Sequence, residues 1–479
     1  MSIMGVLDIG SKALAAQKTA IEVTGENVTN VNTPGYSRQT VVLETAPGSV
    51  DSRYPIGSGV NVAAVQRSHD TFLQTQIQAE TSSNGKQTVV QDALAKVEPL
   101  FNETASSGIG ASLQDYFTAW QDLSVNPQGT TERQAVLSKA QTVIDDFHRV
   151  SQSLKDQTQQ ANQSLTGLTA DITAKLKQVA GLNDQIRVLE TGGGSASQLR
   201  DSRDQLLQGI SQKVGISYRE QSDGTMTVTL GSNSWGPTLV QGATASALTV
   251  NTSGSASASI ILKNTPADPG TDVTSLITAD SKSGELGGTL QVRDQVLPGF
   301  SGKLDELAYN VATQVNTLHS TGYGLTGGTG VNFFTPPAPV TPPATYASGY
   351  SGLIGLNITS TNDIAAATAA GATGDNRNAL ALAGLKNKTI TVAGVQTTLP
   401  GLYSSLVGEV GVAVQNSQQG VTQSTAMLKQ LDNLRESIVG VSLDEELTKL
   451  LSFQKAYEGA AKLITTGQAM IDTVLGMVQ

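Results

Sequence analysis

Apolar residues recur every seven positions near both ends of the chain. Near the N-terminus the repeat consists of Leu7, Leu14, Ile21 and Val28. Near the C-terminus it consists of Leu443, Leu450, Tyr457, Ile464, Ile471 and Val478, with Leu447, Ala461 and Leu475 in a second row. A seven-residue repeat lines up side chains along one stripe of a helix and is typical of coiled coils. The pattern therefore predicts two terminal helices that pair antiparallel. The residues expected side by side are those near Leu14 and Ile21 and those near Tyr457 and Ile464.

The first helix is predicted to end at a turn within "NVNTPGYSRQ", residues 30–39. Pro34 presets φ for the second position of a type II turn, and Gly35 supplies the positive φ that the third position requires. The proline also disfavours helical backbone at the residue before it. The chain is therefore expected to change from a helix of about residues 2–30 to an extended arm over about residues 38–68. The residues of this turn motif are Asn30, Asn32, Thr33, Pro34, Gly35 and Tyr36.

The middle of the chain has mostly helical periodicity, interrupted by one stretch of period two. Helices are expected over residues 113–127, from about 131, along the apolar stripe from Leu165 to Leu189, and over 197–212, 291–320 and 403–439. From Val214 to Leu230 apolar residues alternate around Asp223-Gly224, which predicts a β-hairpin. Short β-like pieces continue to about residue 284 in a segment rich in Ser, Gly and Ala. The segment "LIGLNIT" (353–359) is predicted to form a strand, whereas the Pro-rich loop 336–343 matches no pattern that indicates a role.

Together these patterns predict an α+β multidomain protein. We expect a terminal α-helical coiled-coil domain from residues 1–60 plus 440–479, and a mainly helical middle (body) domain from 61–212 plus 285–439. An all-β domain of residues 213–284 is expected as an insertion into the body. A chain of 479 residues is too long for one core, and about two to four domains are expected at that length.

Composition excludes several classes of function. The net charge is −10 and no Lys/Arg cluster stands out, so no nucleic-acid or anionic-membrane partner is expected. There are no cysteines, which removes disulfides, thiolate metal sites and cysteine nucleophiles. No run of 18 apolar residues exists, so no membrane span is predicted. The N-terminal segment lacks the basic region of a secretory signal peptide, so an exported chain would need another route.

No residue pattern indicates a catalytic, metal or cofactor site. Gly322, Gly324 and Gly327 fit G-x-G-x-x-G, but they follow a helix, whereas a dinucleotide fold needs a strand there. The motif is therefore interpreted as a glycine loop. The histidines are His69, His148 and His319. They lie on different predicted elements without metal-ligand spacing, and each is expected on the surface or at a helix cap.

Two groups of charged residues have structural interpretations. Asp444, Glu445 and Glu446 would lie in the first turn of the last helix, where the helix dipole favours negative charge. Ser442 and Glu445 also have the spacing of a capping box. "RDSRDQ" (200–205) alternates in sign, which indicates pairing along one helix face, with contact to a neighbouring subunit as the alternative.

Both ends resemble the bacterial flagellar axial proteins, the family of rod, hook and hook-associated proteins. The family's N-terminal signature is similar to "NVNTPGYSRQ" and its C-terminal signature to "LDEELTKLLSFQKAYEGAAKLITTGQAMIDTVL". Internal stretches such as "LQDYFTAWQDLSVNPQGTTERQAVLSKAQTV" and "GELGGTLQVRDQVLPGFSGKLDELAYNVATQVNTLHSTGYGLTG" are similar to the hook-associated members. The resemblance covers most of the chain outside residues 231–284 and the Pro-rich loop.

The resemblance implies a structural adaptor with no enzymatic activity, no cofactor and no small-molecule substrate. Such a protein assembles with itself into a helical ring at the hook tip, between the hook protein and hook-associated protein 3, and so joins hook to filament. It is exported unfolded through the flagellar type III apparatus after being held by an export chaperone, and its location is the secreted flagellum. The terminal helices would form the innermost layer, and the β domain would point outward. The assembly seam would consist of Leu7, Leu14, Ile21, Val28, Leu443, Leu447, Leu450, Tyr457, Ile464, Ile471 and Leu475.

Two alternatives stay open. Another axial protein, of the hook or the distal rod, would share both ends but lack the long helix from Leu165 to Leu189. A secreted enzyme on axial-type ends would need clustered His, Asp or Glu in the insertion, and residues 213–284 contain no histidine.

Overall fold

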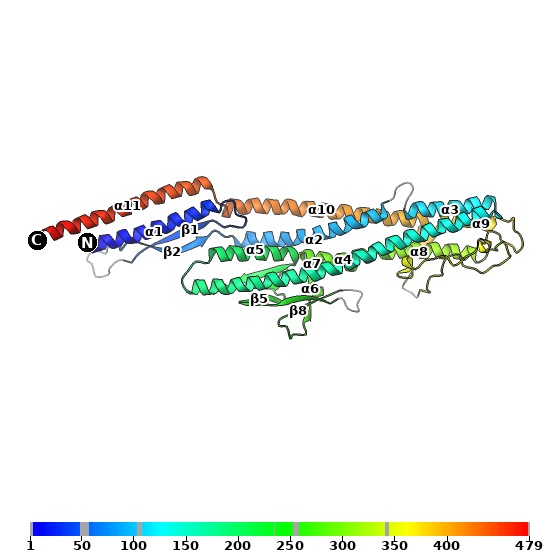
Figure 1. The fold of residues 1–479 in the computed structure, drawn as a ribbon, viewed down its shortest axis with the longest axis horizontal. Helices are drawn as coiled ribbons and strands as arrows, with labels where there is room; N and C mark the ends of the chain where they lie inside the picture. Colours follow the sequence, from blue (N-terminus) through cyan, green and yellow to red (C-terminus); the bar gives the residue numbers. More distant parts are fainter. Residues whose placement is uncertain are drawn as a thin grey trace.

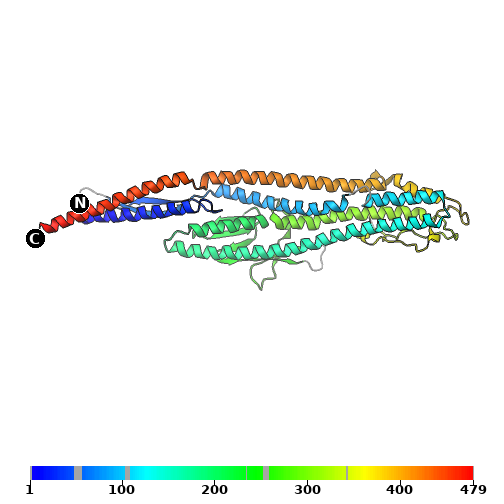
Figure 2. The ribbon, with the colours of Figure 1, turned by 45° about the horizontal axis from the view of Figure 1, so that its top comes forward.

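The protein is an elongated rod in which long helices run along one axis (Figures 1 and 2). The computed structural model describes residues 3–47, 57–102, 108–233, 235–251, 258–340 and 344–477. Both chain ends lie at the same tip, where α1 (Ile3–Thr29) and α11 (Leu443–Gly476) are side by side. The β strands of the insertion lie against the flank of the rod. This arrangement confirms the predicted α+β fold with terminal helices, a helical body and a β insertion.

The terminal helices pair antiparallel, as predicted, and two glycine contacts define their register. Gly467 lies so close to α1 that a Cβ there would stand 2.9 Å from Leu7 Cδ2. A Cβ on Gly10 would likewise stand 2.7 Å from Ile464 Cγ1. Ile464 therefore packs against Gly10, and Leu14 lies about one helical turn further along α1. The two glycines set the register because they let the helices approach most closely.

The row of α11 that faces α1 differs from the predicted second row. The buried residues of α11 are Glu446, Ala460 and Gly467, which lie multiples of seven apart. Leu447 and Leu475 were predicted for this row, but their exposed fractions are 47% and 60%. The seven-residue repeat at Leu450, Ile464 and Ile471 has a neighbouring row on each side along α11. The row that contains the small residues Ala460 and Gly467 packs on α1, because small side chains let the two helices approach more closely. Val478 lies outside the described residues.

A cysteine pair tests this register. We expect Leu7→Cys with Gly467→Cys to form an intrachain disulfide, because a disulfide needs Cβ atoms about 3.8 Å apart and the chain has no other cysteine. Non-reducing electrophoresis and peptide mapping of the oxidised chain give the readout. Leu14→Cys with Ile464→Cys, one turn out of register, is the control. Equal yields from both pairs would contradict the register.

A β-hairpin packs on α1 beside α11. It consists of β1 (Gln39–Thr45) and β2 (Val60–Arg67), which pair antiparallel with a register shift between Val42 and Leu43. Gly59, with φ +102°, lies against Ile9 of α1. The predicted domain boundary at residue 60 would cut this hairpin. We therefore propose that the terminal unit comprises residues 3–69 and 440–477.

The body has one large core at the end of the rod away from the chain termini. It is built from α2 (Thr71–Phe101), α3 (Ile109–Val125), α4 (Thr130–Thr191), α8 (Leu297–His319), α9 (Arg377–Gly384) and α10 (Leu399–Val439). Its centre is a cluster of aromatic rings from Tyr116, Trp120, Phe333 and Phe334, with centroids 4.9 to 6.3 Å apart. The two helical stretches expected after residue 131 form one helix, α4, of 62 residues.

A second core lies between the β insertion and the helices nearest the terminal unit. It joins the second half of α4 with α5 (Ser197–Lys213), α6 (Thr274–Ala279), α7 (Gly284–Gln291) and two antiparallel sheets. The first sheet has the order β3 (Ile216–Glu220), β4 (Met226–Leu230), β5 (Thr238–Gln241), β6 (Thr244–Ala245). The second has the order β7 (Ala247–Asn251), β8 (Ser259–Lys263), β9 (Thr271–Asp272). The predicted hairpin at Asp223-Gly224 joins β3 to β4, with Gly224 at φ +79°. Because the sheets share this core with helices, we propose that they form one unit with them.

The remaining elements are short. A π-helical segment η1 (Val292–Val296) joins α7 to α8, and 3-10 turns occupy η2 (Tyr350–Gly352), η3 (Thr361–Asp363) and η4 (Leu385–Asn387). β10 (Ile390–Val392) and β11 (Val395–Thr397) form a small hairpin. The strand predicted at 353–359 is wrong: only Leu356 makes an isolated bridge, to Phe334. Residues 341–343 of the Pro-rich loop lie outside the described residues. None of the helices in the described ranges is long and apolar enough to cross a membrane.

His319 lies in the last turn of α8, so it is at a helix end as one of the two expected positions allowed, but it is buried and not at the surface. Its exposed fraction is 1%, and it packs against the rings of Trp120 and Phe333. Ala365 N donates to its Nε2 at 3.0 Å, so Nδ1 carries the proton and donates to the Val331 carbonyl at 2.7 Å. Both ring nitrogens are therefore satisfied in the neutral form. Burial is the main reason why the pKa of His319 falls to about 4.

The lowered pKa of His319 predicts acid sensitivity of the large core. The unfolded chain, with a histidine pKa near 6.5, takes up the proton first, so the free energy of unfolding falls as pH drops from about 6.5 to 4. A shift of this size corresponds to about 3 kcal/mol. Denaturant unfolding between pH 7 and pH 4 measures it, with His148→Gln as the surface control. An identical pH slope for wild type and His319→Gln would contradict the assignment.

Candidate functional site

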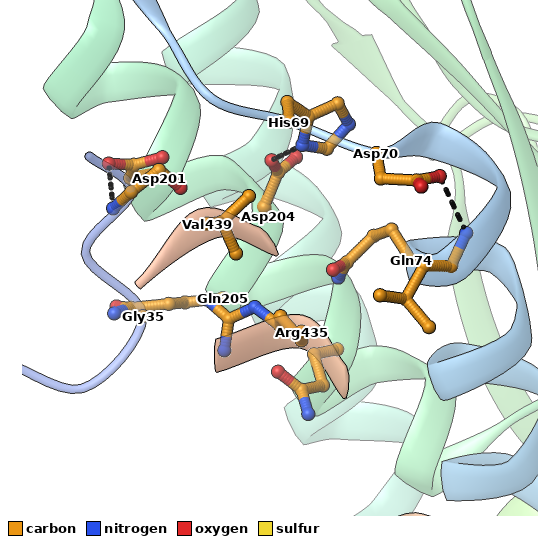
Figure 3. Close-up of a pocket in the computed structure, with 12 residues that line it drawn as sticks. Gly35, His69, Asp70, Gln74, Asp201, Asp204, Gln205, Arg435 and Val439 are labelled. Carbon is orange, nitrogen blue, oxygen red and sulfur yellow. Dashed lines mark hydrogen bonds and ion pairs between the residues drawn. The ribbon is translucent and has the colours of Figure 1, made fainter. Parts of the chain in front are cut away.

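The candidate functional site is the joint at which the terminal unit meets the body. The chain passes between the two parts at residues 68–70 and 440–442, and the loop 30–38, which joins α1 to β1, lies beside these crossings. None of these segments is α-helical. α5 of the body lies beside the loop 30–38 and beside the crossing at residues 68–70 (Figure 3). Everything that joins the two parts of the rod therefore passes through loops and through the side chains around them.

The predicted turn motif forms this joint's central loop. Tyr36 N donates to the Thr33 carbonyl at 3.2 Å, and Gly35 has φ +79°, which confirms a type II turn. Gln205 of α5 donates from Nε2 to the Pro34 carbonyl at 2.5 Å. A Cβ on Gly35 would stand 2.1 Å from that Nε2. The glycine thus allows both the turn and its close contact with α5.

Asn27 links the end of α1 to the loop and to α11. Its Oδ1 accepts from the Tyr36 hydroxyl at 2.8 Å and from Gln39 N at 2.9 Å. Its Nδ2 donates to the Gln39 carbonyl and to Glu446 Oε2, both at 2.8 Å. Burial and the nearby Glu26 raise the pKa of Tyr36, so the phenol remains a donor. The side chain of Asn27 is fully satisfied although it has no exposed surface.

Glu446 is the buried charge at the start of α11. Its side chain is 2% exposed and accepts from Arg38 Nε at 2.9 Å. Arg38 also donates from Nη2 to Glu445 at 2.9 Å and from its backbone N to the Val439 carbonyl at 3.2 Å. The predicted capping box does not form, because Glu445 pairs with Arg38 and the Ser442 side chain makes no capping bond. The interpretation of Glu446 as a dipole charge was incomplete: the residue holds three segments together.

A second ionic cluster lies on α5. Arg67, at the end of β2, donates from Nη1 to Asp201 at 2.8 Å and to Asp204 at 2.7 Å. Asp201 also accepts from Ser37 N at 3.1 Å. The charges of "RDSRDQ" were predicted to pair along their own helix, and this is wrong. They pair across elements, because α5 is wedged between the terminal unit and the second core.

The arginines of the same segment face that second core. Arg200 bonds Glu190 of α4 at 2.7 Å, and it also pairs with Glu220 of β3. Arg203 has no exposed side-chain surface and donates to the Gly224 carbonyl at 2.8 Å. α5 therefore presents carboxylates to the terminal unit and guanidinium groups to the β insertion.

His69 adds little charge to the joint. Burial and the neighbouring Arg67 lower its pKa, so the ring is neutral near pH 7 and its 3.8 Å approach to Asp204 is a weak contact. Within the described ranges, no group of three His, Asp or Glu residues could hold a metal ion. The carboxylates of Asp201, Asp204 and Glu446 instead accept hydrogen bonds from side-chain or backbone donors of the protein itself.

The predicted site residues differ in how exposed they are. In the turn motif Asn32, Thr33 and Pro34 are exposed, and Asn30, Gly35 and Tyr36 are half-buried. The half-buried members of the predicted seam are Leu7, Leu14, Ile21, Val28, Leu450, Ile464 and Ile471. Its exposed members are Leu443, Leu447, Tyr457 and Leu475.

Sequence reasoning missed the polar residues that make the joint. They are Asn27, Arg38, Arg67, Asp201 and Glu446. One signal was available: Glu446 belongs to the same seven-residue row as Ala460 and Gly467. A charge in an apolar seam needs a buried partner, although the sequence does not identify that partner as Arg38.

Comparison with known proteins finds relatives along the whole chain. Residues 94–334, half of the chain, match the family described as flagellar hook-associated protein FlgK helical domain. Residues 7–36 match the flagella basal body rod protein family, and residues 435–477 match the C-terminal family of the flagellar basal body rod FlgEFG proteins. The two end matches contain the turn motif and α11, respectively.

Individual relatives match almost end to end. Flagellar hook-associated protein 1 of Bacillus subtilis is 29% identical, covering 98% of this chain and 97% of the relative. The protein of that name from Escherichia coli is 27% identical, covering 97% of this chain and 98% of the relative. The flagellar hook junction protein FlgK of Burkholderia pseudomallei has a similar fold, with TM-score 0.66, 19% identity, and coverage of 76% of this chain and 100% of that one.

Proposed function

The chain belongs to the FlgK family of flagellar hook-associated proteins, and from this premise we propose that it is a structural adaptor that joins hook to filament. The observation that carries the proposal is the end-to-end similarity to relatives named hook-associated protein 1. A protein of this family is a structural component of the flagellum and works beside other axial proteins. Its place is accordingly the secreted flagellum, at the hook–filament junction.

The surface of α11 supports self-assembly as the mechanism. Large apolar side chains stay exposed along this helix: Leu443, Leu447, Leu451, Tyr457, Leu463, Met470, Val474 and Leu475. α1 covers only one row of α11. Apolar surface of this extent marks an interaction site, and neighbouring copies in a ring would cover it. The exposed seam residues then act between subunits, and the half-buried ones act within each subunit.

The more specific partners belong to the same proposal. We assign the hook protein to one side of the ring, hook-associated protein 3 to the other, and an export chaperone to the stage before assembly. The polar joint supports an adaptor role, because it connects an assembly-competent terminal pair to a body with its own two cores. No catalytic activity is part of the proposal.

Localisation tests the proposed function. In a strain that lacks the endogenous protein, a tagged copy is expected at the hook tip alone, seen by immunogold microscopy of isolated hooks. Without it, filament protein is expected in the medium, since no junction receives it. Label along the hook shaft, or normal filaments in its absence, would overturn the proposal.

One alternative has an observation in its favour. The two end matches belong to rod-type families, as they would in a hook or distal-rod protein. Those matches cover the termini that axial proteins share, whereas the match to residues 94–334 is to the hook-associated family. Label along the shaft in the same experiment would support this alternative.

A further inference from the structure

We propose that the joint is a hinge held closed by an ionic latch on α5, so that the terminal unit and the body are rigid parts with an adjustable angle. This deepens the proposed function and rests on it, because an adjustable angle is useful to a subunit placed between two different structures. The hinge itself is a property of the isolated chain.

The two sides of the joint do not share a hydrophobic core. Among the described residues, neither of the two large apolar clusters includes a residue of α1, α11, β1 or β2. The terminal unit buries its own set, which includes Ala16, Ala20, Val23 and Ala460. Connections without a shared core permit relative motion of the parts.

What crosses to α5 is a line of polar contacts. Ser195, just before α5, donates from Oγ to the Val65 carbonyl at 3.0 Å. Gln198 pairs with Glu26 of α1. Asp201 accepts from Ser37 N and from Arg67, and Asp204 also accepts from Arg67. Gln205 donates to the Pro34 carbonyl. The spacing of three and four residues puts these groups on one face of α5. We call this face the latch.

The other face of α5 anchors this helix to the body. The opposite face of α5 packs into the second core through Leu207 and Ile210, neither of which is exposed. α5 therefore stays with the body when the polar contacts on its other face exchange for water. Arg67 and its two carboxylates, which are 9% to 15% exposed, are the strongest part of the latch, because charge-assisted bonds of this kind exceed neutral ones.

The far side of the joint leaves room for rotation. A polar cleft of about 1250 Å³ opens between the turn motif and the α10–α11 junction, and Asn32, Arg435 and Glu445 are among its lining residues. Hinges are short loop segments that absorb backbone rotation, and both crossings, at residues 68–70 and 440–442, are of that kind. Opening of the latch would let the terminal unit swing into this cleft.

Single-molecule FRET on the purified chain tests the hinge. Labels go on Ser452→Cys in α11 and Gln178→Cys in α4, both exposed positions in a chain without native cysteine. We expect wild type to give one narrow distance distribution. The double variant Asp201→Asn/Asp204→Asn, and separately Arg67→Met, are expected to broaden and shift it, with unchanged far-UV circular dichroism.

The matched control is Asp184→Asn, which removes an equally short ion pair, with Arg187, on the surface of α4. It should leave the distribution unchanged. A latch variant with the wild-type distribution, a wild type already as broad as the variants, or a loss of helix signal in the latch variants would each overturn the hinge. None of these outcomes depends on where the protein sits in the flagellum, so this test and that of the proposed function fail separately.

Discussion

Replacing Glu446 with Ala is expected to release α11 from α1. The substitution leaves Arg38 without its buried partner and Asn27 Nδ2 without one of its two acceptors. Removal of one member of a buried ion pair costs about 3–5 kcal/mol. Because α11 buries few other residues, we expect this loss to separate the helices. Hydrogen exchange of the purified chain should show faster exchange in α1 and α11 and unchanged protection in both body cores.

The neighbouring glutamate provides a matched control. Glu445 contacts the same arginine at the same 2.9 Å, but its side chain is 60% exposed. An exposed ion pair contributes about 0–1 kcal/mol, so Glu445→Ala should leave exchange nearly unchanged. Similar exchange in both variants would show that burial of Glu446 is not what holds the terminal pair.

Replacing Leu450, Ile464 and Ile471 together with Ala is expected to abolish junction assembly but not secretion. These half-buried residues form the row of α11 next to the buried Ala460 and Gly467, and Ile464 meets Gly10 directly. Truncating a fully buried Leu or Ile costs about 2–5 kcal/mol, and these half-buried residues should each lose less. The losses add within each subunit and recur in every copy around a ring. Motility should be lost, and filament protein should accumulate in the medium.

Exposed apolar residues elsewhere control for loss of hydrophobicity alone. Val188, Leu353 and Leu380 are 62%, 71% and 49% exposed and lie on the body. Their joint replacement with Ala should leave motility intact. Normal motility in the α11 variant would contradict the seam, and non-motile cells from the control variant would show that the assay does not distinguish the two surfaces.

Local patterns predicted most elements correctly. The turn motif specified its own conformation, because proline fixes φ at one position and glycine permits the positive φ that the next position requires, whatever surrounds them. Likewise α5 and the hairpin at Gly224 followed from short-range periodicity and turn chemistry. The strand expected at 353–359 failed because its apolar residues pack into the large core from a loop, where Ile354 and Ile358 are buried without sheet partners.

The joint was much less predictable than the elements that it connects. Arg67 and Asp201 are 134 residues apart, and Asn27 and Glu446 are 419 apart. No local pattern couples positions so distant in the chain. The burial of His319 was not predictable for the same reason, because it depends on Trp120 and Phe333, which come from other parts of the chain.

The sequence by itself determined the helical ends, their antiparallel pairing and the turn that ends α1, because each of these follows from repeats and from backbone chemistry. The family followed from the resemblance of both ends and of internal stretches to the flagellar axial proteins. Only the tertiary structure decided the register of the terminal pair, the second row of its seam and the polar contacts of the joint. The register depends on where Gly10 and Gly467 allow the two helices to approach. The second row of the seam depends on which side of the Leu450–Ile471 repeat carries the small residues of α11. The joint depends on charges that find partners only once distant segments are packed together.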